Sequence, residues 1–306
     1  MQIPSTPAWC AAGLWLAACV SAAPALAHPG SGIAVDQAGN VYFVDTGAGV
    51  WKIDSQRQVA RLKGPAYHFM AMDGLGRLVQ AKLPRASGEE VELVGSKPAL
   101  ILASGYPIAV SQKGDFFYPA PYKNDRVQIW RFSPPAKSQV FATLPEIKEV
   151  DAQGESRAVP WIHGLAAAPD GSVYYTEQRA VRRISPDGAV TAIAENVTVP
   201  DCERPPLGKN ERIGPALRGL DVRADGTVFV AASACSAVLK ITSQGEVSVV
   251  LRATDAWSPT GVAVSGDDLY VLEYLHISTE RREEWLPRVR MLAANGTATI
   301  LCSIER

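Results

Sequence analysis

The chain has 306 residues, of which 47% are hydrophobic and 20% are charged, so its composition is that of an ordinary globular protein and not of a disordered or collagen-like one. A chain of this length buries about 75% of its unfolded surface, so it needs neither a disulfide network nor a structural metal merely to fold. Its formal net charge of -1 excludes charge-driven binding to nucleic acid or to an anionic membrane surface.

An uncharged apolar segment, Ala8–Ala23, lies near the amino terminus and is followed by Pro24. It is shorter than the ~20 residues that a membrane-spanning helix needs. Residues Ala25–Ala27 read Ala-Leu-Ala, which is typical of a signal-peptidase cleavage site. We therefore expect residues 1–27 to be a secretory signal peptide and the mature protein to be periplasmic or secreted. One alternative stays open, because the sequence Leu-Ala-Ala-Cys ending at Cys19 resembles a lipoprotein signal, in which that cysteine carries a lipid anchor.

One sequence pattern recurs six times along the rest of the chain. Each copy has a short apolar strand, a turn rich in Gly and Asp, and a second strand rich in Val, Tyr and Phe. The copies begin at Gly32 (GIAVDQAGNVYFVD), Phe69 (FMAMDGLGRLVQA), Pro107 (PIAVSQKGDFFYP), Gly164 (GLAAAPDGSVYYTE), Gly219 (GLDVRADGTVFVAA) and Gly261 (GVAVSGDDLYVLE).

Most copies continue into a second strand pair, as in the run AVRRI, SPDG and AVTAIA that follows Glu177. Gly and Asp at such places supply the backbone angles of tight hairpins. A single sheet of four short strands cannot bury both of its faces, so neighbouring copies must stack. We therefore predict an all-β fold, a six-bladed β-propeller of four-stranded antiparallel blades over residues 31–305, and we expect a monomer. The last copy supplies all four of its own strands, so no exchanged strand is expected to close the ring.

The repeat resembles that of the NHL-repeat propellers and their relatives, the gluconolactonase and senescence-marker family and the streptogramin lyases. The resemblance covers nearly all of the mature chain. It implies the fold and leaves the function open, because propellers of this kind carry many functions.

The insertions between copies all fall at one end of the predicted propeller, which we call the top face. Loops longer than ~12 residues are usually either functional or disordered, so three long loops on one face predict a walled pocket at the top of the central channel. The long insertions are Pro145–Ile162, Glu195–Arg218 and Tyr274–Pro287, and a shorter one is Pro119–Arg126.

The residue before each inner strand is expected to point into the channel mouth. In chain order these residues are Ser31, His68, Tyr106, His163, Arg218 and Thr260. In one interpretation this ring is polar only because it is solvated. In the other, His163 is a general base or a metal ligand and Arg218 binds an anionic group, while His68, Tyr106 and Thr260 contact the ligand.

Acidic residues end several of the second strands: Asp45, Glu177 and Glu273. A structural interpretation is that each carboxylate ties down the loop that follows it. A functional interpretation is that Glu177 orients His163 for proton transfer and that Glu273 contacts the ligand. The hairpin from His163 to Glu177 also resembles the active hairpin of virginiamycin-type lyases. That resemblance implies base-catalysed opening of a lactone ring with help from a metal.

A divalent metal is a possible cofactor that the sequence does not identify. His68, His163 and His276, the last in the blade-six insertion and a further candidate ligand contact, could together hold a cation, as the lining histidines of the peptidylglycine amidating lyases do. The calcium-binding pattern of the gluconolactonase family is not matched, because Ser31, His163 and Arg218 stand at its ligand positions. Calcium prefers several oxygen ligands, and a guanidinium would repel it, so lactonase activity does not carry over directly.

Two functions of different classes remain. The first is a lyase or hydrolase of a small anionic lactone or ester, with His163 as base, Glu177 orienting it and Arg218 binding the substrate carboxylate or oxyanion. The second is a non-catalytic propeller whose top face binds a ligand or a protein.

Three cysteines follow the signal segment. Cys202 and Cys235 lie in top-face loops of the same predicted blade, and an exported protein meets an oxidising compartment, so we predict a disulfide between them. Cys302 alternates like a packed apolar residue in an outer strand, so we predict a buried free thiol.

Overall fold

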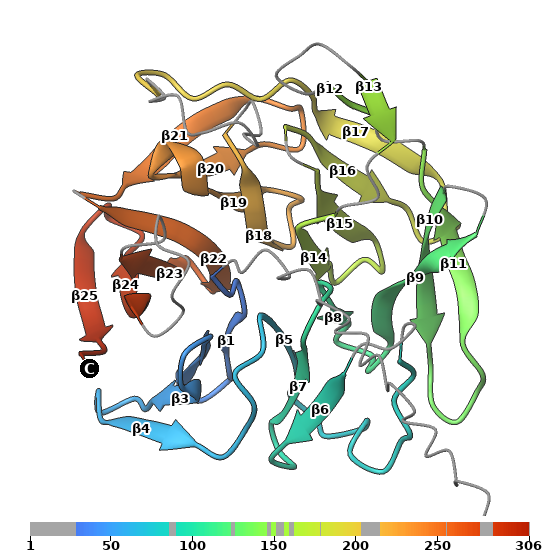
Figure 1. Cartoon of the computed structure of the whole chain (residues 1–306), viewed down its shortest axis with the longest axis horizontal. Helices are drawn as coiled ribbons and strands as arrows, with labels where there is room; N and C mark the ends of the chain where they lie inside the picture. The colour runs from blue at the N-terminus through green and yellow to red at the C-terminus, as the bar shows by residue number, and fades with distance from the viewer. Residues whose placement is uncertain are drawn as a thin grey trace, which may run out of the picture.

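The computed structural model describes residues 29–85, 90–123, 126–145, 148–150, 156–158, 162–177, 179–202, 215–254, 256–275 and 284–305. Their regular structure is almost entirely β, and six antiparallel sheets are arranged around a central axis as blades (Figure 1). The predicted six-bladed β-propeller is therefore confirmed. Residues 1–27, the predicted signal peptide, lie outside the described residues.

Five blades have the predicted four strands, and in each of them the strand that comes first in the chain lies next to the axis. These strands are, in blade one, β1 (Ile33–Val35), β2 (Val41–Asp45), β3 (Gly49–Ile53) and β4 (Val59–Leu62); in blade three, β8 (Ala109–Val110), β9 (Phe116–Lys123), β10 (Arg126–Phe132) and β11 (Gln139–Thr143); in blade four, β14 (Gly164–Ala167), β15 (Val173–Thr176), β16 (Val181–Ile184) and β17 (Val190–Ala194); in blade five, β18 (Leu217–Val222), β19 (Val228–Ala232), β20 (Ala237–Ile241) and β21 (Val247–Arg252); and in blade six, β22 (Trp257–Ser265), β23 (Asp268–Leu275), β24 (Leu286–Leu292) and β25 (Ala298–Ser303).

Blade two differs from the others. Its described residues form three strands, β5 (Phe69–Asp73), β6 (Val91–Val94) and β7 (Ala99–Ala103), in the order β5-β7-β6. The predicted second strand, RLVQA, is a turn instead, because the Asp73 carboxylate accepts hydrogen bonds from the backbone N–H groups of Leu75 at 3.2 Å and Leu78 at 2.6 Å.

The second strand of a blade is buried on both faces because each blade packs between two neighbours. Every residue of β2 is buried, whereas the outer strand β4 is mostly exposed. Burial therefore falls from the second strand of a blade to its outer edge.

Blade six supplies all four of its own strands, as predicted, so the ring closes without an exchanged strand. Side chains of the last blade instead bond to the main chain of the first. The Thr260 hydroxyl donates to the Gly30 carbonyl oxygen at 2.6 Å, and the Tyr274 hydroxyl donates to the Val44 carbonyl oxygen at 2.7 Å.

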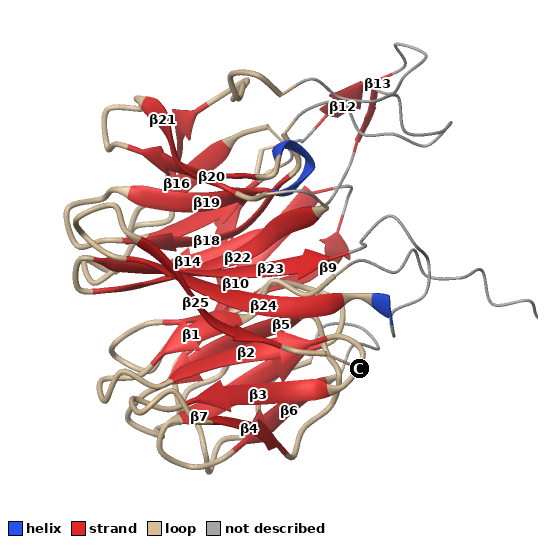
Figure 2. Ribbon diagram, turned by 90° about the vertical axis from the view of Figure 1, so that its left-hand side faces the viewer, coloured by secondary structure: helices blue, strands red, loops and turns tan. Residues whose placement is uncertain are grey.

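Figure 2 shows the propeller from the side, with short turns along one face. The 3-10 turn η1 (Ser233–Cys235) and the added hairpin β12 (Lys148–Val150) and β13 (Ser156–Ala158) lie on the opposite face, the predicted top. The shorter predicted insertion, Pro119–Arg126, was wrong as a loop, because β9 and β10 extend through it as a longer hairpin that pairs Lys123 with Arg126. Within the described ranges, no helix is long and apolar enough to cross a membrane.

Candidate functional site

Glycines bring the inner strands close together at the top of the channel. A Cβ atom on Gly164 would lie 2.5 Å from the Arg218 carbonyl oxygen, and one on Gly219 would lie 2.9 Å from the Cα atom of Gly261. Neighbouring blades can approach this closely only where side chains are absent. The predicted ring residues directly precede these glycines, so His163 and Arg218 lie at adjoining positions of the channel mouth.

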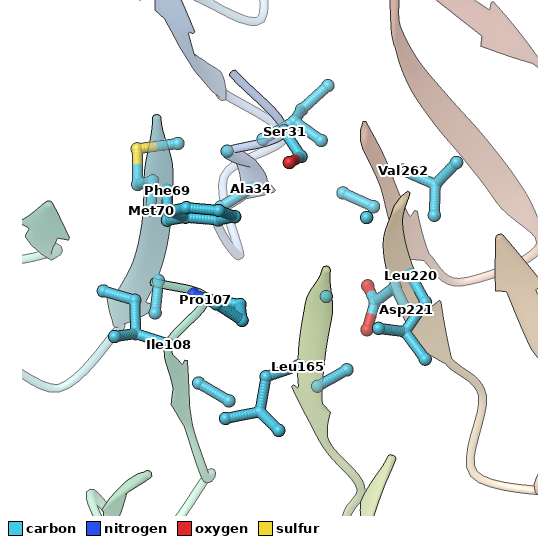
Figure 3. A pocket seen from close by; sticks show the side chains of 18 of the residues that line it. Ser31, Ala34, Phe69, Met70, Pro107, Ile108, Leu165, Leu220, Asp221 and Val262 are labelled. Atoms are coloured by element: carbon cyan, nitrogen blue, oxygen red, sulfur yellow. The ribbon is translucent and has the colours of Figure 1, made fainter. Parts of the chain in front are cut away.

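The channel itself is small and mostly apolar, with a volume of about 180 Å³ (Figure 3). Its polar lining side chains are Ser31, His163 and Asp221. Ligand sites for drug-sized molecules usually occupy ~300–1,000 Å³. A drug-sized ligand would therefore bind at the channel mouth and not inside the channel.

His163 lines this channel immediately before β14. Its backbone N–H donates to the Thr176 carbonyl oxygen at 3.0 Å, which continues the pairing of β14 with β15 by one residue. The imidazole is therefore carried by a fixed strand end. A group on a rigid strand can be aimed more precisely than one on a loop.

Glu177 follows β15 in the same blade and is buried. It accepts a hydrogen bond from Arg182 Nε at 2.6 Å, and Arg182 also pairs with Glu195 at 2.9 Å. Burial raises the pKa of the Glu177 carboxyl above its ordinary value, although the charge of Arg182 acts in the opposite direction. A carboxyl group with a raised pKa exchanges protons more readily near neutral pH, which suits a role in proton transfer.

Arg218 is half-buried on β18. Its Nη1 donates to the Pro29 carbonyl oxygen at 3.1 Å, and its own carbonyl oxygen accepts the Thr176 hydroxyl at 2.8 Å. The structure thus joins the backbone of Arg218 to the His163 hairpin, whereas the side chains of Glu177 and Arg218 lie outside the channel lining.

The other predicted ligand contacts occupy different environments. His68 Nδ1 donates to the Ser104 carbonyl oxygen at 2.6 Å, which places the proton of a neutral ring on Nδ1. Tyr106 is buried among apolar side chains, and Thr260 is fully buried in its bond to Gly30, so their predicted contact with a ligand remains a prediction. His276 lies outside the described residues.

Two of the acidic residues that end second strands are fully buried. Asp45 ties down the following loop as predicted, because it accepts hydrogen bonds from the Gly47 N–H at 2.9 Å and Trp51 Nε1 at 3.2 Å. Glu273 instead lies between two arginine side chains, Arg288 and Arg290.

This arginine pair was missed by the sequence reasoning. Arg288 Nε lies 2.5 Å from Glu273 Oε2, and Arg290 Nη2 contacts the other carboxylate oxygen. The guanidinium of Arg288 also stacks at 4.0 Å over the ring of Trp257. The available signal was the alternation of Arg and apolar residues in RVRML, which places both guanidinium groups on one face of β24.

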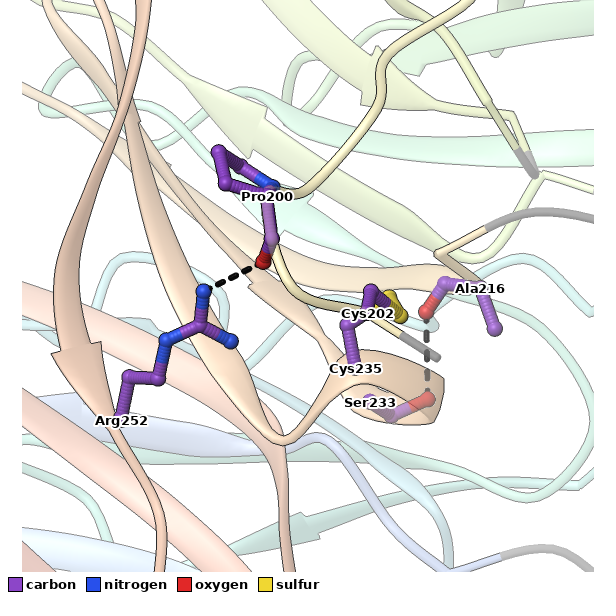
Figure 4. The surroundings of a disulfide bond; sticks show 6 residues. All are labelled: Pro200, Cys202, Ala216, Ser233, Cys235 and Arg252. Atoms are coloured by element: carbon purple, nitrogen blue, oxygen red, sulfur yellow. Dashed lines mark hydrogen bonds between the residues drawn. A yellow bond between two sulfur atoms is a disulfide. The ribbon is translucent and has the colours of Figure 1, made fainter. Parts of the chain in front are cut away.

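The predicted disulfide between Cys202 and Cys235 is present, with Cα atoms 5.2 Å apart (Figure 4). Cys302 is a buried free cysteine, as predicted. The segment that enters blade five is held near this bond, since the Ser233 hydroxyl donates to the Ala216 carbonyl oxygen at 3.1 Å. Ala216 is two residues before Arg218. Disulfides are typical of proteins in oxidising compartments.

No cluster of three or more His, Cys, Asp or Glu side chains that could hold a metal occurs in the part of the chain that the structure describes. The three-histidine cation site includes His276 and remains a prediction.

We expect Glu177→Gln to change how stability depends on pH. A folded-state pKa above the ordinary value of 4.5 means that ionising Glu177 costs stability, so its contribution to the free energy of unfolding falls as pH rises above about 4. The glutamine variant lacks this loss, so its stability relative to wild type should increase with pH and then level off. Urea unfolding of both proteins between about pH 4 and 8 measures this.

Glu195→Gln is the matched control, because the exposed Glu195 shares the same partner, Arg182. The charge of Glu195 is one of the causes that raise the pKa of Glu177, so removing it should weaken the pH dependence seen in wild type without abolishing it. Parallel curves for wild type and Glu177→Gln would contradict the raised pKa.

Comparison with known proteins adds one partial sequence match. No protein-family model matches the chain. Over 115 residues the chain is 33% identical to a virginiamycin B lyase of Nocardia farcinica, a stretch that is 37% of this chain and 35% of that enzyme. The chain thus matches about a third of the length of this curated relative.

Solved structures share the fold over most of the chain. A streptogramin B lyase has a TM-score of 0.50 and 14% identity, covering 90% of this chain and 83% of its own. A luciferin-regenerating enzyme has a TM-score of 0.51 and 16% identity, covering 86% and 91%. An auxiliary nutrient binding protein of Bacteroides thetaiotaomicron has a TM-score of 0.53 and 10% identity, covering 86% and 69%. The chain thus shares its β-propeller fold with a streptogramin B lyase, a luciferin-regenerating enzyme and an auxiliary nutrient binding protein.

Proposed function

We propose that the chain is an exported lyase or hydrolase that opens a small anionic lactone or ester at the top of its channel. The observation that carries this proposal is the position of His163, an imidazole on a rigid strand end at the channel mouth, in a hairpin whose Thr176 hydroxyl donates to the Arg218 carbonyl oxygen. The partial match to a virginiamycin B lyase supports the lyase form. Export is supported by the disulfide and by the signal-like sequence of residues 1–27.

In the lyase form, His163 removes a proton from the carbon next to the one that bears the ester oxygen. The C–H and C–O bonds break, a C=C bond forms, and the carboxylate leaves with its electron pair. Arg218 stabilises that carboxylate, and Glu177 acts as a positioning residue that favours the protonated imidazole. His163 later releases the proton to water, so the reaction consumes no water.

The test is a screen of the mature protein against small lactones and esters, with products identified by mass spectrometry. Hydrolysis adds the mass of one water and elimination adds nothing, so the two reactions are distinguished directly. We expect His163→Ala to lower kcat/KM by about 10²–10⁴-fold while thermal unfolding stays close to wild type. A variant that unfolds early but keeps its activity per folded molecule would show that His163 is structural.

A second candidate is a non-catalytic binding propeller. It is favoured by the similarity in fold to a nutrient-binding protein and by the way Glu177 and Arg218 are engaged by other groups. Saturable ligand binding that survives His163→Ala, with no turnover of any ester or lactone, would favour this candidate.

A further inference from the structure

One position of the inner strands breaks the repeat. In five copies the third residue of the pattern is alanine, and in the copy of blade five it is Asp221. All six residues line the central channel. The alanines are Ala34, Ala71, Ala109, Ala166 and Ala263. An acidic side chain thus replaces a methyl group in one blade, within a channel whose lining is otherwise mostly apolar.

The carboxylate of Asp221 faces the interior of this channel (Figure 3). Oδ1 accepts a hydrogen bond from the Val222 N–H at 2.8 Å, and Oδ2 accepts one from the Val264 N–H of blade six, also at 2.8 Å. A carboxylate has about four lone-pair sites, so about two remain for another partner.

The negative charge of Asp221 has no cationic partner in the described structure. Its polar contacts are the two backbone N–H groups, and burial raises its pKa to about 6 in spite of them. The other titratable side chain in the channel lining is His163, which lies at the mouth. Asp221 is half-buried inside a narrow channel, and charges withdrawn from bulk water in proteins are normally paired with an opposite charge or bound to a metal.

The edge of the inner strands that faces the axis carries backbone carbonyl oxygens, which are the further ligands that a cation beside Asp221 would need. Along an inner strand, the backbone N–H and C=O groups of successive residues point alternately toward the next strand of the blade and toward the axis. The N–H of Arg223 points toward the next strand, because it donates to the Thr227 carbonyl oxygen at 2.9 Å. Val222 and Val264 therefore present their N–H groups to the axis, and the carbonyl oxygen of a strand residue points to the same edge as its N–H. Carbonyl oxygens can replace the hydration shell of a cation.

We propose that the central channel binds one monovalent metal cation, held by the Asp221 carboxylate and by inner-strand carbonyl oxygens. A single positive charge neutralises the single carboxylate, whereas a divalent ion would leave a net positive charge among apolar side chains. The volume of about 180 Å³ suits an ion with some of its water. This site lies below the glycines that narrow the channel and is independent of the reaction proposed at the mouth.

The test measures thermal unfolding of the mature protein while KCl or NaCl replaces N-methylglucamine chloride at constant ionic strength. We expect wild type to gain about 5 °C at a salt concentration 100-fold above the dissociation constant. Asp221→Ala should show no such gain. It restores the alanine of the other five copies, so it should fold, and near-UV circular dichroism checks this. Asp225→Ala, which removes an exposed turn carboxylate of the same blade, should respond like wild type.

Anomalous diffraction from crystals grown in RbCl gives a second measurement, since it locates the ion directly. Rubidium density beside Asp221 in wild type, and none in Asp221→Ala, supports the site. Three outcomes overturn it: an equal response of both proteins to the salts, no rubidium in the channel, or stabilisation through Asp221 by CaCl₂ but by neither monovalent salt. None of these depends on whether the protein opens an ester or lactone.

Discussion

Replacing Glu273 with glutamine should lower the free energy of unfolding by about 3–5 kcal/mol. The side chain keeps its size but loses the charge that lies between Arg288 and Arg290. Both arginines are less than 10% exposed, so their charges cannot turn to solvent without moving the strand that carries them. Breaking a buried ion pair by removing one partner leaves an uncompensated buried charge, which is the costly part.

Chemical denaturation of wild type and Glu273→Gln measures this effect. Glu246→Gln, at an exposed turn, is the control and should stay within about 0.5 kcal/mol of wild type. Replacing Glu273, Arg288 and Arg290 together with apolar residues of similar length should restore much of the loss, because no buried charge is then unpaired. A Glu273→Gln variant as stable as wild type would contradict the buried triad.

The fold could be predicted because the repeat combines two signals that agree. Apolar runs next to Gly and Asp turns specify short hairpins, and six similar copies specify their stacking. The prediction was wrong for the second strand of blade two, because the composition of the residues after Asp73 is typical of a strand although they form a turn. The backbone N–H groups of Leu75 and Leu78 donate to the Asp73 carboxylate, and these hydrogen bonds favour a turn over a strand.

The candidate site could be predicted only in part. The height of the ring residues along the channel axis could be predicted from the repeat, because each of them directly precedes the first residue of a copy. The partners of the side chains could not be predicted in this way, because Glu177 is engaged by Arg182 from the next strand and Arg218 by Pro29 from the far end of the sequence. Such contacts depend on the three-dimensional packing of the blades.

Asp221 shows a different limit. Its position is visible when the copies are aligned, but the fold is predicted from what the copies share. The one copy that differs is where the channel gains a charge. Departures from a repeat are therefore as informative about function as the repeat is about the fold.

Replacing both Cys202 and Cys235 with serine should lower the free energy of unfolding by about 4 kcal/mol. The bond joins residues 33 apart in the sequence, and the chain-entropy model gives this value for a loop of that length. Cys302→Ser is the control, since its thiol is free and its removal leaves the loop closed. Denatured, unreduced mature protein should contain one free thiol, assigned to Cys302 by peptide mass spectrometry.

The same disulfide should also order the backbone at the channel mouth. A change confined to that region would distinguish this local role from a general effect on the stability of the fold. Ala216 is held by Ser233, two residues before Cys235, and Ala216 adopts a left-handed backbone with φ of 49°, which is unfavourable for a residue with a side chain. Opening the disulfide removes the tether that opposes this strain, two residues before Arg218. Hydrogen exchange should therefore rise at residues 215–218 and 233–236 in the double serine variant at temperatures well below its unfolding. Faster exchange spread evenly over all blades would show instead that the bond acts only on global stability.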